Sequence, residues 1–374
     1  MTNSKDEELR TLQHPVQADV ESVRSQQDFD GDHRSEESIA SIDCVPGGQS
    51  QPLPPSKTYH PFSPHVLALL IPFSIFGTLA RLGLQALATY DDQSVFPLAY
   101  VQSTGCFVMG FFLRLKGPMG DFYAPLYTAI TTGFCGSLTT FSGWQLDVFN
   151  SWINAGGGDR GGFQDFIDGL TKTVFTLSLS LGSMSFGSYL SKFIEPTIPR
   201  PKLSQPPRTA RISLTILSIL AYIATLPIYF RLPPSFRGQA TAALLFAFPG
   251  TLTRYFLSIY FNPFLASLPL GTFMANMIGT GLLAVFHVLQ NMGVNASPVS
   301  PGACSILQGL GDGYCGCLTT ISTFAAEIRA LRTPFEKVRY VLISWVVGQL
   351  LMLLVFGPAL LSGRIQRDRL CAFE

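Results

Sequence analysis

The chain contains little charge of either sign. Only 13% of its 374 residues are Asp, Glu, Lys or Arg, and the formal net charge is +1, whereas an ordinary soluble domain is about 25% charged. Because neither sign is in excess, the composition gives no reason to expect nucleic acid or another polyanion as a partner. Hydrophobic residues make up 47% of the chain, including 30 phenylalanines. This composition predicts an integral membrane protein.

The usual signatures of enzymes are also missing. No P-loop of the form GxxxxGK[ST] is present, so coupling to ATP is not expected. His287 is the one histidine well inside a predicted helix, and no His–carboxylate or Cys–His set accompanies it. The seven cysteines are odd in number and scattered through apolar segments, which is not the pattern of a disulfide framework. The pair Cys315 and Cys317 has no histidine near it, so we expect neither a thiolate metal site nor an enzyme.

The polar residues gather at the ends of the chain. Residues 1–62 are rich in Ser, Gln, Asp, Glu and Pro, which predicts a disordered tail without a signal peptide. A short C-terminal tail is expected at 364–374. Between them lie nine apolar runs, each long enough to cross about 30 Å of hydrocarbon as a helix. We expect an all-α polytopic membrane protein with transmembrane helices near 65–90, 97–114, 122–150, 167–194, 211–230, 238–261, 268–290, 303–330 and 338–362.

Basic residues indicate the orientation of these helices. An odd number of spans puts the two termini on opposite faces, and Lys and Arg favour the cytosolic loops. More of them lie in the loops after the second, fourth and eighth runs than in the others. This distribution favours a cytosolic N-terminus.

Three motifs occur twice, in the same order. They are Gly77-Thr-Leu-Ala-Arg81 with Gly250-Thr-Leu-Thr-Arg254, Gln102-Ser-Thr-Gly105 with Asn276-Met-Ile-Gly279, and Gly133-Phe-Cys-Gly136 with Gly313-Tyr-Cys-Gly316. The chain therefore divides into four-helix repeats at 63–195 and 236–363, joined by a linker at 196–235 that holds one further helix. That single helix would invert the second repeat, giving a pair related by a pseudo-two-fold axis in the membrane plane.

The motifs resemble those of a known family. G-F-C-G-x-L-T-T-F-S, G-x-x-x-R and N-x-x-G are similar to motifs of the Fluc/CrcB fluoride channels, and two repeats fused by a linking helix resemble the eukaryotic fluoride exporters. The resemblance covers residues 65–362. It implies a channel in the plasma membrane that passively exports cytosolic fluoride and so protects the cell from fluoride toxicity. It also implies that a single chain works without a homodimer partner.

The residues suit the transport of fluoride. A pore must replace the water around this small anion with hydrogen-bond donors, and hydroxyl groups donate without carrying charge. The phenyl rings of Phe141 and Phe324 have electropositive edges that hold an anion weakly. The resemblance implies that Asn276 reaches into the pore. The hydroxyl candidates are Thr139, Thr140 and Ser142, then Thr319, Thr320, Ser322 and Thr323, with Ser344 in the last helix.

The two repeats differ at the aromatic positions. Pairing across the repeats, as the resemblance implies, gives Phe141 with Phe324 in one pore and Ile321 with Trp144 in the other. An aliphatic chain has no polarised edge, and an indole is bulkier than a phenyl ring. The hypothesis is therefore one working pore and one vestigial pore. The vestigial pore would contain Gln102, Ile321, Trp144 and Ser178, although Ser178 and Ser344 are as well explained as serines satisfied by their own helices.

Several polar positions have two interpretations. The resemblance implies a structural Na⁺ held by the backbone carbonyls of Gly136 and Thr139 with Gly316 and Thr319, but the glycines also suit close helix packing. Arg81 and Arg254 either attract anions at a vestibule or anchor helix ends. The matching carboxylates Asp147 and Glu327 are expected to cap or to lie at the interface, since they would repel fluoride. Proton-coupled transport of fluoride or another small anion is the alternative function, for which these two carboxylates are the candidates.

Overall fold

The computed structural model describes residues 59–88, 97–194, 196, 205–231, 240–291 and 300–362. Within these ranges every regular element is a helix. The predicted tails at 1–62 and 364–374 lie outside the described residues, apart from Tyr59 to Phe62.

Seven long helices account for most of the described chain. They coincide closely with seven of the predicted apolar runs, because a run of that length and composition forms a helix with few polar interruptions. They are α1 (Pro64–Ala88), α2 (Pro97–Arg114), α6 (Gly162–Ile194), α7 (Arg208–Arg231), α9 (Ala242–Phe261), α10 (Leu270–Asn291) and α14 (Pro334–Leu361).

Five of the described segments are long and apolar enough to cross a membrane by themselves. These are α1, α7, α9 with its short extension η5 (Asn262–Phe264), α10 and α14. A sixth arises if α2 and the following segment Lys116–Trp152, bent by 109°, are taken together. Helix α6 has the length but not the hydropathy, since Asp165, Asp168 and Lys172 lie near its start and several serines follow in its second half.

The two remaining predicted runs are broken helices. The first comprises α3 (Lys116–Thr128), the π-helical turn η2 (Ala129–Cys135), α4 (Gly136–Leu138) and α5 (Phe141–Trp152). The second comprises α11 (Pro301–Gly309), η6 (Leu310–Cys315), α12 (Gly316–Leu318) and α13 (Ser322–Ala330).

The chain leaves the helical conformation at the threonines, not at the glycines. Thr139 has φ −92° and ψ 148°, and Thr319 has φ −93° and ψ 153°, both extended. Gly136 and Gly316 keep helical angles. The glycines of the repeated motifs therefore do not end the helices. Gly313 allows close approach of α9 instead, because a Cβ on it would overlap the backbone of Ala243.

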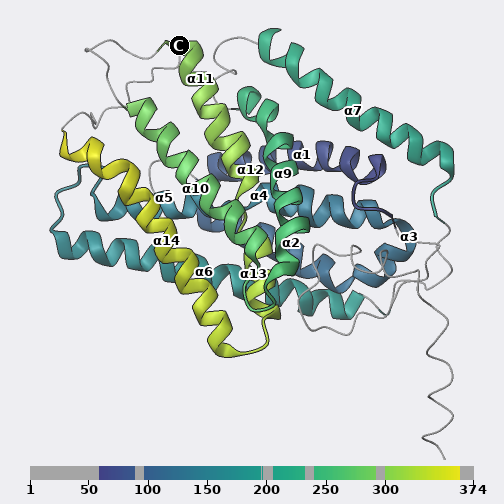
Figure 1. The fold of residues 1–374 in the computed structure, drawn as a ribbon, viewed down its shortest axis with the longest axis horizontal. Coiled ribbons are helices and arrows are strands. Elements are labelled where there is room, and N and C mark those ends of the chain that lie inside the picture. The colour runs from purple at the N-terminus through teal and green to yellow at the C-terminus, as the bar shows by residue number, and fades with distance from the viewer. Residues whose placement is uncertain are drawn as a thin grey trace, which may run out of the picture. The chain divides into compact units, whose positions relative to one another are not determined.

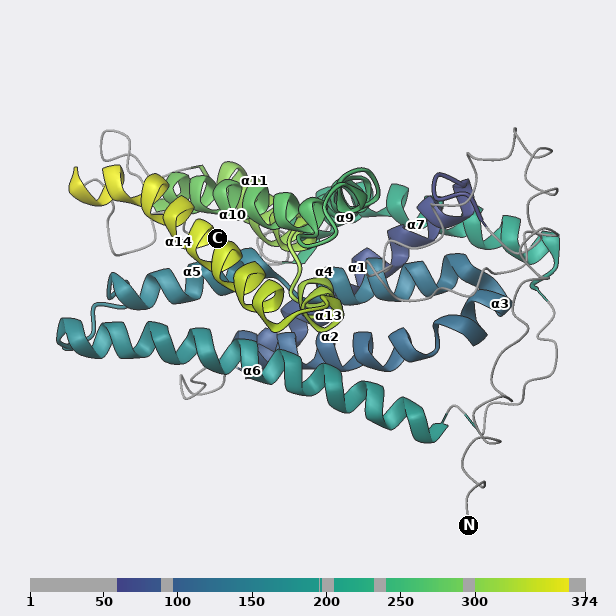
Figure 2. The same ribbon diagram turned by 60° about the horizontal axis from the view of Figure 1, so that its bottom comes forward.

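The helices pack in repeat-like pairs, with α2 against α6 in the first half and α10 against α14 in the second. Helices α5 and α6 run side by side (Figure 2). Helix α7, which follows the first four predicted spans, contacts α1 and α9 and lies at the edge of the helices in Figure 1. Only 11% of the residues in its most apolar stretch are buried inside the protein. Most of its Leu and Ile side chains are therefore available to lipid.

Two glycines of α6 provide a matched test of this packing. A Cβ on Gly187 would overlap the carbonyl group of Phe107 in α2, whereas nothing lies within 4 Å of one on Gly182. We expect Gly187→Ala to cost about 1–3 kcal/mol by overpacking. Gly182→Ala should be neutral or stabilise by up to about 1 kcal/mol, because alanine loses less entropy in a helix. Thermal unfolding of the detergent-solubilised protein measures both changes, and equal shifts would contradict this account of α2 and α6.

Candidate ion-conduction site

At each helix break, a threonine hydroxyl accepts hydrogen bonds from the helix start of the other repeat. The hydroxyl of Thr139 accepts hydrogen bonds from the backbone N–H groups of Ile321 and Ser322 at 3.2 and 3.0 Å, where α13 begins. In return, the hydroxyl of Thr319 accepts from the N–H of Ser142 at 3.1 Å, where α5 begins. A helix start has N–H groups without partners in its own helix. Each repeat thus caps the broken helix of the other.

These two threonines are already engaged as donors. The hydroxyl of Thr139 donates to the carbonyl of Cys135 at 3.0 Å, and that of Thr319 donates to the carbonyl of Cys315 at 3.0 Å. A hydroxyl has one proton. Thr139 and Thr319 are therefore better explained as caps than as donors to an ion, although the sequence had placed them among the candidate donors.

The other predicted hydroxyls gather around these caps. Thr140 lies 3.0 Å from Thr319, and Thr320 lies 3.1 Å from Thr139, measured between hydroxyl oxygens. All members of the cluster are buried. The remaining members are Ser142, 3.0 Å from Thr319, Ser322, 3.0 Å from Thr139, and Thr323, whose N–H lies 3.5 Å from the Thr320 hydroxyl.

Two amides hold the breaks in place from neighbouring helices. The Asn276 side chain in α10 donates to the carbonyl of Thr320 at 3.3 Å and accepts from its N–H at 2.9 Å. Gln102 in α2 does the same for Thr140, at 2.6 and 3.2 Å. The extra methylene of Gln102 therefore leaves the hydrogen-bond pattern unchanged. Each amide keeps one further N–H, since a side-chain amide has two.

The aromatic residues lie edge to face beside the hydroxyl cluster. The ring centroids of Phe141 and Phe324 are 5.5 Å apart with an interplanar angle of 74°. Trp144 packs edge-on against Phe141 at 5.4 Å. Ile321 belongs to the same buried apolar cluster. The sequence pairs Phe141 with Phe324 and Ile321 with Trp144, and the structure brings all four into one cluster.

One predicted pore residue is misplaced. Ser178 lies on the exposed face of α6, where it borders a shallow surface depression with Gly182. Ser180, two residues further along the same helix, is buried, and in α14 Ser344 is buried. Matching Ser178–Gly182 to Ser344–Gly348 thus put α6 out of register by two residues. A two-residue error in a helix rotates a side chain by more than half a turn.

The two arginines cross to the opposite repeat. Arg254 donates through Nε to the carbonyl of Cys317 at 2.9 Å and through a guanidinium nitrogen to that of Thr132 at 2.8 Å. Arg81 donates to the carbonyl of Asp312. A Cβ on Gly136 would overlap the Arg254 guanidinium. Both arginines are buried, and each donates to a carbonyl in the broken segment of the opposite repeat.

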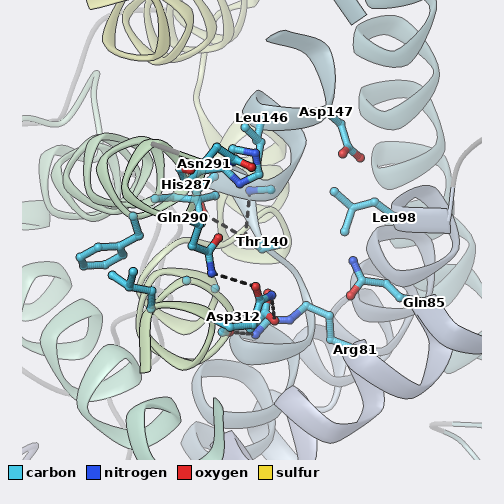
Figure 3. Close-up of a pocket in the computed structure, with 18 residues that line it drawn as sticks. Arg81, Gln85, Leu98, Thr140, Leu146, Asp147, His287, Gln290, Asn291 and Asp312 are labelled. Atoms are coloured by element: carbon cyan, nitrogen blue, oxygen red, sulfur yellow. Dashed lines mark hydrogen bonds between the residues drawn. The ribbon is translucent and has the colours of Figure 1, made fainter. Parts of the chain in front are cut away.

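Arg81 also borders a polar cavity of about 260 Å³, here called the vestibule. It lies between α1, α5, α10 and the second broken helix, with Thr140 and Ser142 on its wall. Figure 3 shows Arg81 reaching toward Asp312 while Gln290 approaches from the opposite side. The polar side chains Gln85, Gln290, Gln308 and Asp312 were not selected from the sequence, although each stands out as a polar residue in an apolar helix.

The matching carboxylates have different surroundings. Asp147 lines the vestibule. Glu327 accepts hydrogen bonds from Thr272 at 2.5 Å, Tyr340 at 2.7 Å and Asn262 at 3.3 Å. Glu327 thus ties α13 to α9, α10 and α14 through hydrogen bonds.

A family comparison matches both halves of the chain. The sequence model described as "CrcB-like protein, Camphor Resistance (CrcB)" matches residues 68–187 and again residues 241–357. The chain belongs to this CrcB-like family. The two matched regions contain the two helix breaks, one in each, and the helices around them are those of a multi-pass membrane protein.

Relatives with established names give the same result. Fluoride export protein 1 of Neurospora crassa is 34% identical over 78% of this chain, which covers 66% of that protein. Fluoride export protein 1 of Candida albicans is 32% identical over 81% of the chain and 80% of its own length. The fluoride-specific ion channel FluC of Escherichia coli is 38% identical over 79 residues, 21% of this chain. No solved structure matches the chain significantly.

The amide clamps allow a direct test of the breaks. Gln102→Leu would leave the buried N–H and C=O of Thr140 without partners, at about 1–3 kcal/mol for each group. We expect a large drop in the thermal unfolding midpoint. Thr104→Ala, on the exposed side of the same helix, removes only a bond to the carbonyl of Tyr100 and should change stability little. A Gln102→Leu protein as stable as Thr104→Ala would show that the clamp is unimportant.

Proposed function

We propose that the chain is a fluoride-selective channel that passively exports cytosolic fluoride and thereby protects the cell from its toxicity. Membership of the CrcB-like family and the names of the relatives support this function. The observation that carries the proposal at the level of residues is the edge-to-face pair Phe141 and Phe324, set directly beside a buried hydroxyl cluster. Ring edges and hydroxyls are uncharged donors, which bind an anion without trapping it.

The proposed topology has nine transmembrane helices. The two broken helices and α6 join the five independent spans and α2 to give this number, with α7 inverting the second four-helix repeat. The N-terminus then lies in the cytosol, because the basic loops at Arg114–Lys116 and around Arg332 face that side. We place the channel in the plasma membrane, where export has its use.

Passive export suffices energetically. HF crosses a bilayer as a neutral molecule and dissociates in the more alkaline cytosol, which traps fluoride inside. A negative-inside potential then drives the anion outward by about 2.3 kcal/mol per charge per 100 mV. The channel needs only a selective path for this gradient to act.

We infer that one pore conducts and the other is vestigial. The working pore would use Phe141, Phe324, Asn276 and Ser344 with the hydroxyls Thr140, Thr320, Ser142, Ser322 and Thr323. The vestigial pore would contain Gln102, Ile321 and Trp144. Ser178 is excluded because it lies on the outer face of α6. The packing of Phe324 against Tyr340 of α14, with ring centroids 4.8 Å apart, supports a working path along that helix.

A structural Na⁺ would fit between the two breaks. We propose that the backbone carbonyls of Gly136 and Thr139 with those of Gly316 and Thr319 hold it. These residues are buried, and α4 contacts α12 across the two repeats. Uncharged oxygens suit a hard cation, which would hold the two repeats together.

Proton-coupled transport is the alternative. Its candidate carboxylates are Asp147 on the vestibule wall and Glu327, which three hydrogen-bond donors hold in place. A channel gives a current that reverses at the fluoride equilibrium potential at any pH gradient, whereas a coupled transporter shifts its reversal potential with that gradient.

The function is tested by reconstituting the full chain in liposomes loaded with fluoride. We expect rapid efflux once valinomycin and potassium balance the charge, measured with a fluoride electrode, and no comparable efflux of chloride. Protein-free liposomes provide the control for HF leakage. Chloride efflux as fast as fluoride efflux would contradict a fluoride-selective channel.

The asymmetry of the two pores has its own test in the same assay. Phe141→Ile removes a polarised ring edge from the working pore and should slow fluoride efflux at least tenfold, a barrier increase of about 1.4 kcal/mol. Trp144→Ala removes the indole of the vestigial pore but leaves the ring edges of Phe141 and Phe324 in place, so most of the flux should remain. Equal losses in the two variants would rule out a single working pore.

A further inference from the structure

The vestibule carries more negative than positive charge. Its charged side chains are Arg81, Asp147 and Asp312, with His287 counted as neutral. One arginine against two aspartates leaves a formal charge of −1 on the wall. Charge of one sign in a cavity with low-dielectric walls repels ions of that sign. Such a wall hinders an anion that enters the protein there, but it suits the end at which an anion leaves.

The vestibule lies toward the ends of two helices that run in the same direction. Arg81 and Gln85 belong to the last two turns of α1, which ends at Ala88, and Gln290 belongs to the last turn of α10, which ends at Asn291. With the N-terminus in the cytosol, as proposed, both helices run outward. The vestibule is then the outer mouth. Two members of the hydroxyl cluster also line it, so it borders the proposed pore.

Asp312 differs from its counterpart in the first repeat. The residue before the repeated G-x-C-G motif is Asp312 in the second repeat and Thr132 in the first. The carbonyl of Thr132 accepts a hydrogen bond from Arg254 at 2.8 Å, as the carbonyl of Asp312 does from Arg81. The two positions are therefore equivalent in the structure as well. The first repeat has an uncharged hydroxyl where the second has a carboxylate.

The other carboxylate of the vestibule does have a counterpart. Asp147 in α5 matches Glu327 in α13, since the two residues follow Trp144 and Phe324 by three positions. A carboxylate at this position is common to both repeats. Asp312 is therefore a carboxylate that belongs to one end of the protein only.

Two glutamines hold the Asp312 carboxylate in place. Nε2 of Gln308 in α11 donates to Oδ2 of Asp312 at 2.6 Å, and Nε2 of Gln290 in α10 donates to Oε1 of Gln308 at 3.0 Å. Figure 3 shows Gln290 and Asp312 on the wall of the vestibule beside Arg81. Both glutamines are uncharged, so they fix the position of the carboxylate without cancelling its charge.

We propose that Asp312 makes the channel rectify, so that fluoride passes outward more readily than inward at equal driving force. This inference rests on the proposed function and its topology. The carboxylate offsets the attraction of Arg81 for a departing ion and repels fluoride that arrives from outside. At the opposite end, Thr132 leaves the attraction of Arg254 unopposed. The reversal potential stays at the fluoride equilibrium potential, because fixed charges change the rates of passage and not the gradient.

The unaltered full chain tests the proposal in membrane patches excised from expressing cells, where the cell determines its orientation. With equal fluoride concentrations on both sides, we compare currents at equal and opposite voltages. Fluoride current in the outward direction should be about two- to threefold larger, the effect of one unit charge about 8 Å away in a water-filled space. Equal currents would overturn the proposal. Absence of any fluoride current would instead overturn the proposed function.

Three variants assign the asymmetry to the carboxylate. Asp312→Asn keeps an acceptor for Gln308 but removes the charge, so the ratio of the two currents should fall to about one. Asp312→Glu keeps the charge and should keep the ratio. Asp159→Asn is the matched control, because Asp159 is exposed in the loop between α5 and α6 and solvent screens its charge. An Asp312→Asn channel that rectifies as strongly as the unaltered chain would show that Asp312 is not the cause.

Discussion

The structure depends on satisfying the backbone at two helix breaks that are buried inside the protein. A helix that stops inside a membrane leaves N–H groups without acceptors, and each such group is expensive in hydrocarbon. Here the acceptors are the hydroxyls of Thr139 and Thr319, and each serves the repeat to which it does not belong. Neither broken helix is complete within its own half of the sequence. The two halves are therefore held in one register by the need to cap each other.

The two buried arginines also form hydrogen bonds from one repeat to the other. Arg81 and Arg254 each start in one repeat and donate to carbonyls in the broken segment of the other. A guanidinium buried away from water is tolerated when its donors find acceptors, and the π-helical turns before each break supply them. The arginines, the threonines and the amides of Gln102 and Asn276 together surround a small volume in which nearly every polar group has a stated partner. Among the described residues, the buried exceptions include Nη1 of Arg81, Nε1 of Trp144 and Nε2 of Gln145.

The sequence predicted the positions of the helices well, because long apolar runs and their interruptions determine where a membrane chain is helical. The family resemblance implied that Phe141 pairs with Phe324, and their ring centroids are 5.5 Å apart. It did not predict the register of α6, where serines occur at several positions and glycine spacing selected Ser178 over the buried Ser180. Nor did it indicate that Gln349 donates a hydrogen bond to the buried side chain of Gln145, because the two residues are more than two hundred positions apart. Contacts between distant segments leave no periodic trace in a single sequence.

The difference between Phe141 and Ile321 follows from the covalent link between the repeats. In an assembly of two identical chains, any substitution at a break appears on both sides of the symmetry axis. Losing an aromatic ring in one place then means losing it in both. A tandem chain removes this constraint, so Ile321 can fill space beside Trp144 while Phe141 keeps its ring. Fusion thus lets the two repeats diverge at matching positions, so that one of two related sites can keep a pair of rings while the other loses it.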